Sequence, residues 1–421
     1  YKIDLPAADP AKLDTAFKLL SGMMTAPTLS TANLQADVPI VLSEMRDNAG
    51  VAQRVGRATI QTLFAGQPIT ARDPIGTTET LKGATQQSIR AFHSRWYRPE
   101  RAVIVVAGDA DPAQMTALIG KWFGDWKGIG NPVPAPSFGD PVAPKGADPA
   151  NPVGETRVLV EPDLPRGITV SNLRPWRPVQ DTIVYNQGLM IDSVAQFILN
   201  RRLEDKARSG GSYLAAQVGQ QDISRSADIV QIEVTPSGTD WAKALGDVRA
   251  VIADAVATPP SQEEIDRAAA DMDVAFQIPV EQRPLLRGAK LADDIVQAVD
   301  IRETVANPET VLSIFRQSIP LFTPQAVLEH TRTLFSGTVT RAVYITPKAG
   351  EATAEQLRAA LLAPARPDGS ARLNTAPVSF DKLPPIGTPG AVKAIRPTGI
   401  LDIEEIEFAN GVKALIYPTR D

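Results

Sequence analysis

Apolar residues recur along this chain with two different spacings, and together these spacings predict a mixture of helices and strands. Spacings of three and four residues indicate helices, whereas alternation of apolar and polar residues indicates strands. In the first 130 residues we expect strands at 1–6 and 102–108, and helices at 11–24, 31–64, 86–97 and 112–126. Helices and strands are therefore combined in this part without a regular strand–helix–strand order.

The same mixture continues after residue 155. We expect strands at 156–161, 212–218, 227–235 and 338–345, and helices at 179–208, 240–257, 262–276, 284–299, 309–318, 324–335 and 351–362. The long helix 179–208 is followed by Gly210 and Gly211, residues of the type that ends helices. Because strands and helices do not alternate strictly, this order favours an α+β fold over a doubly wound sheet.

Two proline-rich stretches, 131–154 and 363–400, divide the chain. Such composition resists regular structure and is typical of linkers. We therefore predict a first module at 1–130, a second at 155–362, and the first hairpin of a third at 401–421. The similar element order of the first two predicts a module that is used repeatedly.

The sequence patterns at both ends lead us to expect further chain before Tyr1 and after Asp421. It opens at Tyr1 on a strand-like pattern without a start methionine or a leader. Near the other end, Asn410-Gly411 separates two runs that favour strands, which is a strong hairpin signal. A lone hairpin is marginally stable in water, so we expect more chain to follow and cover it.

Composition narrows the classes of function. The net charge of −5 gives no basic footprint for nucleic acid. No run approaches the roughly 18 to 20 apolar residues of a membrane-spanning helix. The chain has no cysteine, which excludes disulfides, thiolate metal sites and a cysteine nucleophile within it. Absence of cysteine suits a periplasmic protein, with the cytoplasm as the alternative.

Three segments resemble one peptidase family. Residues 92–111, FHSRWYRPERAVIVVAGDAD, combine aromatic residues, a Tyr-x-Pro step, an apolar strand and a Gly-Asp ending. Residues 74–82 read PIGTTETLK, and residues 41–45 read VLSEM on the predicted helix 31–64. All three are similar to the insulinase/pitrilysin family of zinc metallopeptidases, which includes the mitochondrial processing peptidases. The resemblance implies repeated α+β modules, each a mainly antiparallel sheet packed with helices, in two halves that close around peptides.

The resemblance also implies a zinc site. In the family, H-x-x-E-H places two histidine ligands and a general base on one helix, and a later glutamate supplies the third ligand. This chain has only His93 and His330, and neither lies in such a motif. We therefore expect the motif upstream of Tyr1. The resemblance assigns the third zinc ligand to Glu44, beside the apolar stripe of Leu34, Val38, Val41, Met45 and Ala52.

Asp37 lies seven residues before Glu44, so on a helix both carboxylates project from one face, about 10 Å apart. The family has a supporting glutamate there, and the shorter aspartate leaves that contact open. Without the resemblance, both acids would be interpreted as solvated surface charges. Pro39 should kink the helix or mark its start. We interpret His93 and His330 as structural rather than as ligands.

The function predicted from these residues is that of a zinc-dependent endopeptidase, which cleaves peptides in a closed chamber through water activated by Zn²⁺. The expected partners are a peptide or small-protein substrate and the C-terminal half of the same protein, with a homo-oligomer left open. Neither nucleic acid nor a membrane span is expected. The alternative is a catalytically inactive relative that serves as a binding or partner subunit. Metal content of the intact protein would separate the two.

Overall fold

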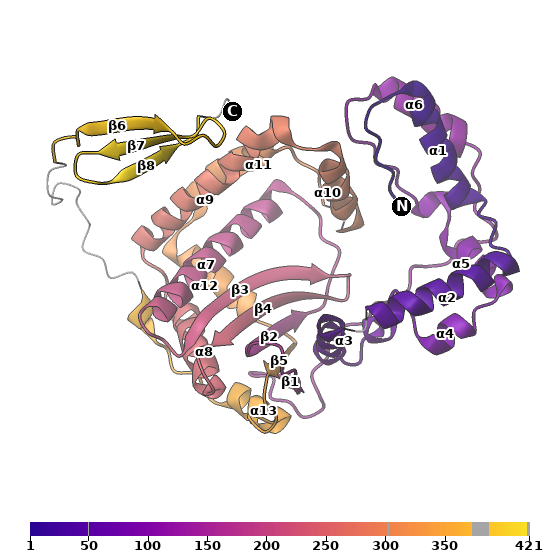
Figure 1. Ribbon diagram of the computed structural model, residues 1–421. Coiled ribbons are helices and arrows are strands. Elements are labelled where there is room, and N and C mark those ends of the chain that lie inside the picture. Colours follow the sequence, from indigo (N-terminus) through magenta and orange to yellow (C-terminus); the bar gives the residue numbers. More distant parts are fainter. Residues whose placement is uncertain (49, 302, 373–386, 419–421) are drawn as a thin grey trace. The chain divides into compact units, whose positions relative to one another are not determined.

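The computed structural model describes residues 1–48, 50–301, 303–372 and 387–418, in two compact units, Tyr1–Leu373 and Asn374–Asp421 (Figure 1). The helices of the first unit are α1 (Pro10–Thr25), α2 (Thr31–Asp47), α3 (Val51–Leu63), α4 (Thr78–Lys82), α5 (Gln86–Trp96), α6 (Pro112–Phe123), α7 (Ile183–Arg208), α8 (Trp241–Ala257), α9 (Gln262–Gln282), α10 (Gly288–Ile301), α11 (Pro308–Ser318), α12 (Pro324–Phe335) and α13 (Ala354–Leu362). No helix among the described residues has the length and apolar character that crossing a membrane requires.

The strands of the first unit form one sheet in the order β1-β5-β2-β4-β3. They are β1 (Val153–Val160), β2 (Gly167–Arg174), β3 (Tyr213–Ile223), β4 (Ala227–Pro236) and β5 (Val339–Thr346). The pair β1 and β5 is parallel, and every other neighbouring pair is antiparallel. The predicted α+β class, with a mainly antiparallel sheet packed with helices, is confirmed.

Strand β2 lies at the centre of this sheet although the sequence analysis assigned no element there. Its residues Ile168 and Val170 are buried, and Val170 lies opposite both Ile232 of β4 and Ala342 of β5. The alternation of apolar and polar residues in GITVSN was the available signal. Nearby Pro165 and Pro175 obscured it, because proline is typical of loops.

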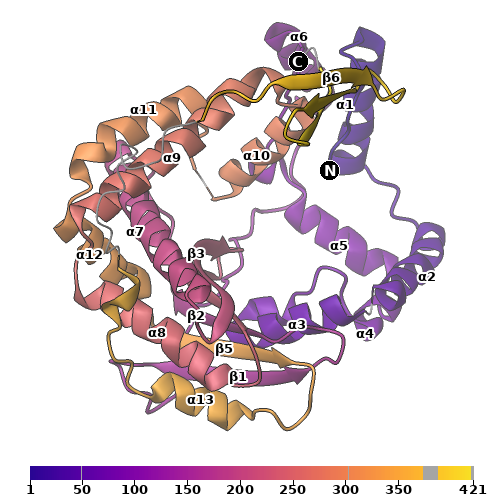
Figure 2. The same ribbon diagram turned by 60° about the vertical axis from the view of Figure 1, so that its left-hand side comes forward.

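The two faces of the sheet are covered by different parts of the chain. On one face, Ile168, Val170 and Ile232 pack in a core with α7, α8, α9 and α12, and α7 lies across this face in Figure 2. On the other face, Leu173 and Val343 pack against Leu63 and Phe64 at the end of α3. Side chains alternate between faces along each strand, which accounts for the two separate cores. Helix α3 lies in the predicted first module, yet it covers the sheet of the second.

The predicted helix 31–64 is two helices. Helix α2 ends at Asp47 with Asn48 as its C-cap, and α3 begins at Val51 with Gly50 as its N-cap. Asparagine and glycine are among the less favourable helix residues, which is consistent with a break between Asn48 and Gly50. The prediction that Pro39 marks the helix start is wrong, because α2 starts at Thr31, where the Ser30 side chain accepts a hydrogen bond from the Asn33 backbone.

The strands predicted at 1–6 and 102–108 do not form. Both segments are irregular, and neither has a strand partner among the described residues. An extended segment becomes a strand only when a neighbour pairs with its backbone groups. Ile104 instead contacts a small core made by Leu13, Phe17 and Met115 of α1 and α6.

The second unit is a three-stranded antiparallel meander of β6 (Val392–Pro397), β7 (Glu404–Phe408) and β8 (Lys413–Ile416). The predicted Asn410-Gly411 hairpin is confirmed, with Gly411 at φ 86°, a conformation that glycine adopts readily. Strand β6 lies inside the predicted linker 363–400, which is therefore not irregular throughout. Residues 373–386 of that linker and residues 419–421 of the predicted hairpin segment lie outside the described residues.

Candidate metal-ligand helix and its surroundings

Helix α2 carries both predicted site residues, and both are exposed to solvent. The carboxylates of Glu44 and Asp37 make no hydrogen bond or ion pair with the described part of the chain. An acid without a partner is free to bind a ligand, and it is equally an ordinary surface charge. The geometry of α2 alone therefore leaves both interpretations open.

The apolar stripe of α2 is only partly covered. Leu34, Val38, Val41 and Met45 are half-buried, Ala52 at the start of α3 is exposed, and no residue of α2 is fully buried. The nearest cover is α4, where the Thr78 hydroxyl lies 3.9 Å from the Met45 sulfur. Ile40 stands 65% exposed on the same helix. Helix α2 is thus an amphipathic helix whose apolar side is largely uncovered by the described residues.

The described residues do not form a zinc site by themselves. No group of three or more histidine, aspartate or glutamate side chains among them is placed to hold a metal ion. Zinc in a catalytic site takes three protein ligands, usually including imidazole. Glu44 offers one carboxylate and has no histidine beside it. Any zinc bound through Glu44 needs ligands from outside the described residues.

The two histidines are held by contacts with residues outside α2. The His93 ring lies 2.9 Å through Nε2 from the carbonyl oxygen of Met24 and stacks on Tyr97 at 4.5 Å. His330 Nδ1 lies 2.7 Å from the Asp192 carboxylate, between α12 and α7. Burial raises the pKa of Asp192, and the hydrogen bond from His330 opposes this rise. These contacts agree with a structural role for both rings.

Helix α3, which follows α2, is fixed to the sheet by polar contacts along its length. The Arg54 guanidinium donates to the Glu161 carboxylate at 2.8 Å near the start of α3. Arg341 of β5, fully buried, donates to the carbonyl oxygens of Leu63 and Val142 and pairs with Glu155. One end of the helical pair is therefore anchored on the second module, whereas α2 extends from it with little cover.

The segment 92–111 contains a buried arginine that the sequence analysis did not single out. Arg98 pairs with Glu100 and donates to the carbonyl oxygens of Ile129 at 2.6 Å and Gly130 at 3.1 Å. A Cβ atom at Gly128 would lie 2.5 Å from the guanidinium, so any other residue there would displace the Arg98 side chain from this position. The available sequence signal for this buried residue was the arginine inside the Tyr-x-Pro step, Tyr97-Arg98-Pro99. The motif thus fixes the chain at 128–130 against α5.

The segment 74–82 has an equally local explanation. Gly76 has φ 77°, which favours glycine, and Thr77 caps α4 through a reciprocal pair of hydrogen bonds with Thr80. Helix α4 contacts α2. The motif therefore builds the helix that lies beside Met45.

Strand β3 offers an open sheet edge. It pairs with β4 on one side, and its other edge has no strand partner in the part of the chain that the structure describes. A groove of about 450 Å³ lies between this edge and α7. Its lining residues are Phe197, Asn200, Arg201, Glu204, Ala207, Arg208, Leu214, Ala215, Ala216 and Gln217. An open edge beside a groove is suited to an added peptide strand.

Part of the chain is similar in sequence to known peptidases. The sequence pattern described as "Peptidase M16 inactive domain" matches residues 83–175, which include the segment 92–111. The "Probable zinc protease PqqL" of Escherichia coli is 28% identical over 119 residues, covering 28% of this chain and 13% of that protein. Residues 83–175 of this chain are thus similar to a domain of the M16 peptidase family. The resemblance to insulinase and pitrilysin relatives is thereby confirmed.

The M16 fold extends across the whole chain. The crystal structure of the periplasmic protease PqqL from Escherichia coli superposes with a TM-score of 0.72 at 16% identity, covering 99% of this chain and 46% of that one. The first half of the same protease gives a TM-score of 0.74 at 18% identity, covering 89% of this chain and 78% of that one. This chain therefore spans less than half the length of PqqL and is similar in fold to its first half.

Proposed function

We propose that this chain is the first half of a zinc-dependent M16 endopeptidase and that Glu44 is a zinc ligand in the intact protein. The observation that carries the proposal is the exposed carboxylate of Glu44, without a partner among the described residues, on a helix whose apolar side is largely uncovered. Similarity to proteins named as zinc proteases supports it. The H-x-x-E-H segment and the C-terminal half of the protein would complete the site. Asp37 would support the ligands from the outer shell.

Zinc at this place would supply a Lewis acid that polarises the scissile carbonyl and lowers the pKa of a bound water. The described residues contribute at most the Glu44 carboxylate to it. An extended peptide or small protein is the proposed substrate, taken up as an added strand at a sheet edge such as that of β3. We also keep the division into modules 1–130, 155–362 and 401–421 as part of the proposal.

A periplasmic location is part of the proposal, supported by fold similarity to a protease described as periplasmic. The second candidate function is a catalytically inactive partner or binding subunit. It is favoured by the match of residues 83–175 to a domain described as inactive. Both candidate functions are compatible with the same fold, so a measurement of peptide cleavage is needed to distinguish them.

Cleavage of an unstructured fluorogenic peptide by the intact protein is the direct test. The proposal predicts turnover that a chelator abolishes and that added zinc restores. Glu44→Gln should abolish turnover, whereas Asp47→Asn, an exposed acid on the same helix, should retain it. Peptide binding without turnover in the zinc-loaded intact protein would favour the inactive subunit instead.

A further inference from the structure

One side of helix α9 changes from charged to apolar halfway along the helix. In its first half this side carries three charged residues at intervals of four, Glu263, Arg267 and Asp271. Val274 and Ile278 continue the same side in the second half, because steps of three and four residues return to one face of a helix. Leu285 follows seven residues after Ile278, in the short helix η3 (Arg283–Leu285). The two halves of this side therefore differ in chemical character.

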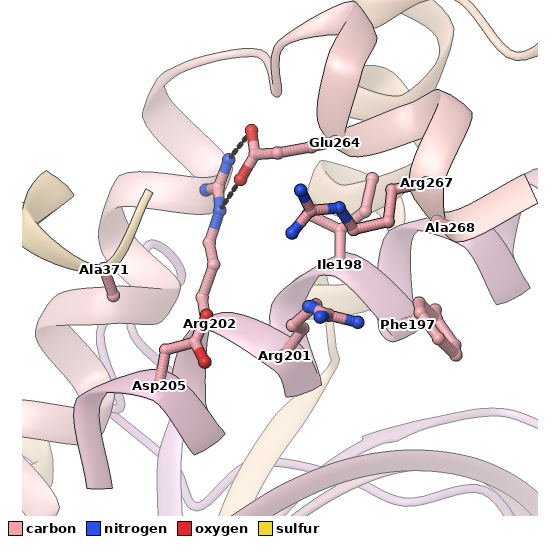
Figure 3. Close-up of a pocket in the computed structure, with 9 residues that line it drawn as sticks. All are labelled: Phe197, Ile198, Arg201, Arg202, Asp205, Glu264, Arg267, Ala268 and Ala371. Atoms are coloured by element: carbon pink, nitrogen blue, oxygen red, sulfur yellow. Dashed lines mark hydrogen bonds and ion pairs between the residues drawn. The ribbon is translucent and has the colours of Figure 1, made fainter. Parts of the chain in front are cut away.

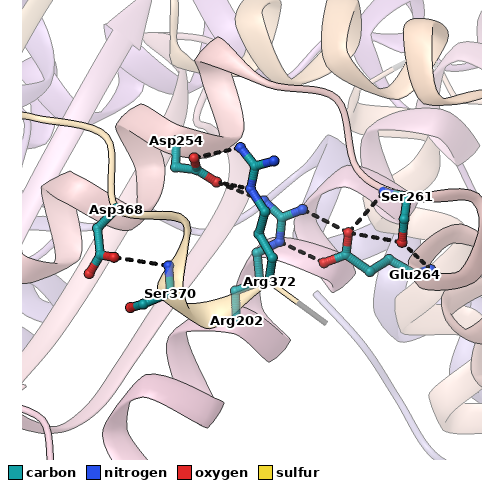
Figure 4. Close-up of polar contacts among 7 residues, drawn as sticks. All are labelled: Arg202, Asp254, Ser261, Glu264, Asp368, Ser370 and Arg372. Atoms are coloured by element: carbon teal, nitrogen blue, oxygen red, sulfur yellow. Dashed lines mark hydrogen bonds and ion pairs between the residues drawn. The ribbon is translucent and has the colours of Figure 1, made fainter. Parts of the chain in front are cut away.

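The first half of α9 is fixed to α7 by a buried charge network. Ser261 and Glu264 cap the helix through a reciprocal pair of hydrogen bonds (Figure 4). Arg202 of α7 donates to both carboxylate oxygens of Glu264, at 2.8 and 2.9 Å, and lies 3.5 Å from Asp254. A cavity of about 20 Å³, the size of about one water molecule, lies beside this pair between the two helices (Figure 3). This half of α9 therefore has close cover.

The second half of α9 is covered on one side by α11. Phe276 packs on Phe315 of α11, with ring centroids 4.9 Å apart. Helices α9 and α11 lie side by side in Figures 1 and 2. After Met272, every residue of α9 is half-buried or exposed. The side that carries Val274 is turned away from Phe276 and is open to solvent.

Four exposed apolar side chains gather at this end of the helix, and we call them the α9 stripe: Val274, Ile278, Leu285 and Leu286. Val274 is 60% exposed and Leu285 is 80% exposed, and the other two are each 45% exposed. Charged groups border the stripe, since Arg283 pairs with Glu309 at 2.7 Å. An apolar centre with a polar rim is typical of a contact surface between proteins or parts of a protein.

The size of the α9 stripe favours a partner within the same chain. Complexes between free proteins use about 20 to 30 residues on each side. Four side chains are too few to hold a free protein or a second copy of this chain. A covalently connected partner has a high effective concentration, so a small contact is enough. This chain superposes over 99% of its length on 46% of the PqqL chain, so a protein of that length has a second half to supply the partner.

We infer that the α9 stripe is a surface on which the C-terminal half of the intact protein docks through an apolar face of its own. The inference rests on the proposal that this chain is the first half of a longer peptidase. It does not depend on Glu44, on zinc or on turnover.

Hydroxyl-radical footprinting of the intact protein, read by mass spectrometry, tests this contact. Leu285 and Leu286 should be oxidised about fivefold more slowly than matched controls, because a docked partner excludes water. Leu214, 69% exposed, is the control for Leu285, and Leu362, 46% exposed, is the control for Leu286. Oxidation of the stripe at the rates of its controls would overturn the inference.

Two variations of the same measurement identify the occupant. Docking of the C-terminal half predicts protection that is the same at low and at high protein concentration. Protection that appears only at high concentration would assign the α9 stripe to a second copy and overturn the inference. Protection that appears only after an unstructured peptide is added would assign it to the substrate and also overturn the inference.

A pair of variants tests the contact from the other side. Ile278→Asp should make amides in the C-terminal half exchange about tenfold faster, because docking is weakened. Ala270→Asp is the matched control, since Ala270 is exposed on the first half of α9 and should leave that exchange unchanged. Unchanged exchange in both variants would contradict the docking role. If Ile278→Asp does not fold, the footprint of the parent protein decides.

Zinc content measured on the same samples keeps this inference separate from the proposed function. A zinc-free protein with a protected α9 stripe would contradict the assignment of Glu44 and support the docking surface. A zinc-bound protein with a freely oxidised stripe would overturn the docking surface alone.

Discussion

Arg341 Nη1 donates a 2.9 Å hydrogen bond to the carbonyl oxygen of Leu63, across 278 residues of sequence. This contact joins β5 to the end of α3, and so joins the helical pair that bears Glu44 to the sheet of the second module. The same guanidinium donates to Val142 and pairs with Glu155. One buried side chain therefore contacts three segments that are far apart in sequence, at Leu63, Val142 and Glu155.

Arg341→Met should lower the free energy of unfolding by about 2–4 kcal/mol, because the buried carbonyl oxygen of Leu63 and the partly buried one of Val142 lose their donor. Lysine should not rescue it fully, since it lacks the planar fork that reaches several acceptors. Urea unfolding measures the difference. Arg157→Met is the control, because exposed Arg157 makes only a long contact of 3.4 Å to Gln61 and should cost less than about 0.5 kcal/mol. Equal losses in both variants would contradict the anchoring role of Arg341.

Glu264→Gln should destabilise the protein by about 2–4 kcal/mol, because it removes the charge that balances buried Arg202. The control is Glu204→Gln, which breaks an exposed ion pair with Arg208 within α7, the helix that also carries Arg202. It should change the free energy of unfolding by less than about 0.5 kcal/mol. Denaturant unfolding monitored by circular dichroism compares the two. A Glu264→Gln variant as stable as the parent would show that the network adds nothing to stability.

Glu351 should make stability fall at acid pH. The hydrogen bond from Arg166, followed by that from Thr346, lowers the pKa of Glu351 to about 2. The unfolded carboxyl has a pKa of about 4.3, so the contribution is fully present above that pH and is lost as the pH falls toward 2. Glu351→Gln should therefore be less stable than the parent at about pH 6, and the difference should vanish near pH 2. Arg166→Met should show the same pH dependence, and a pH-independent difference would exclude this cause.

Periodicity predicted most of the architecture around the sheet, because helices α7 to α9 and α11 to α13 each bury one side in the same core and carry the corresponding apolar spacing. It failed for the segments 1–6 and 102–108, where the local pattern is strand-like but pairing depends on a partner elsewhere. It also merged α2 with α3, since Asn48 and Gly50 weaken a helix without carrying a strong stop signal. The missed strand β2 was hidden by its flanking prolines.

The candidate site was less accessible to sequence reasoning. Glu44 was predicted as a metal ligand from a family resemblance, and no physical feature of α2 alone distinguishes it from other exposed acids. Arg98, Arg341 and Arg202 were not predicted, because burial of an arginine is decided by tertiary acceptors that lie far away in sequence. The groups that accept hydrogen bonds from these buried arginines are therefore apparent only from the three-dimensional structure.

Metal content of the intact protein tests the central claim most directly. After purification with trace zinc and dialysis, the parent protein should retain about one zinc per chain. Glu44→Gln should lose it, Asp37→Asn should weaken it by about tenfold, and Asp47→Asn should retain it. A parent protein without zinc, or a Glu44→Gln variant with full occupancy, would contradict the assignment of Glu44 as a metal ligand.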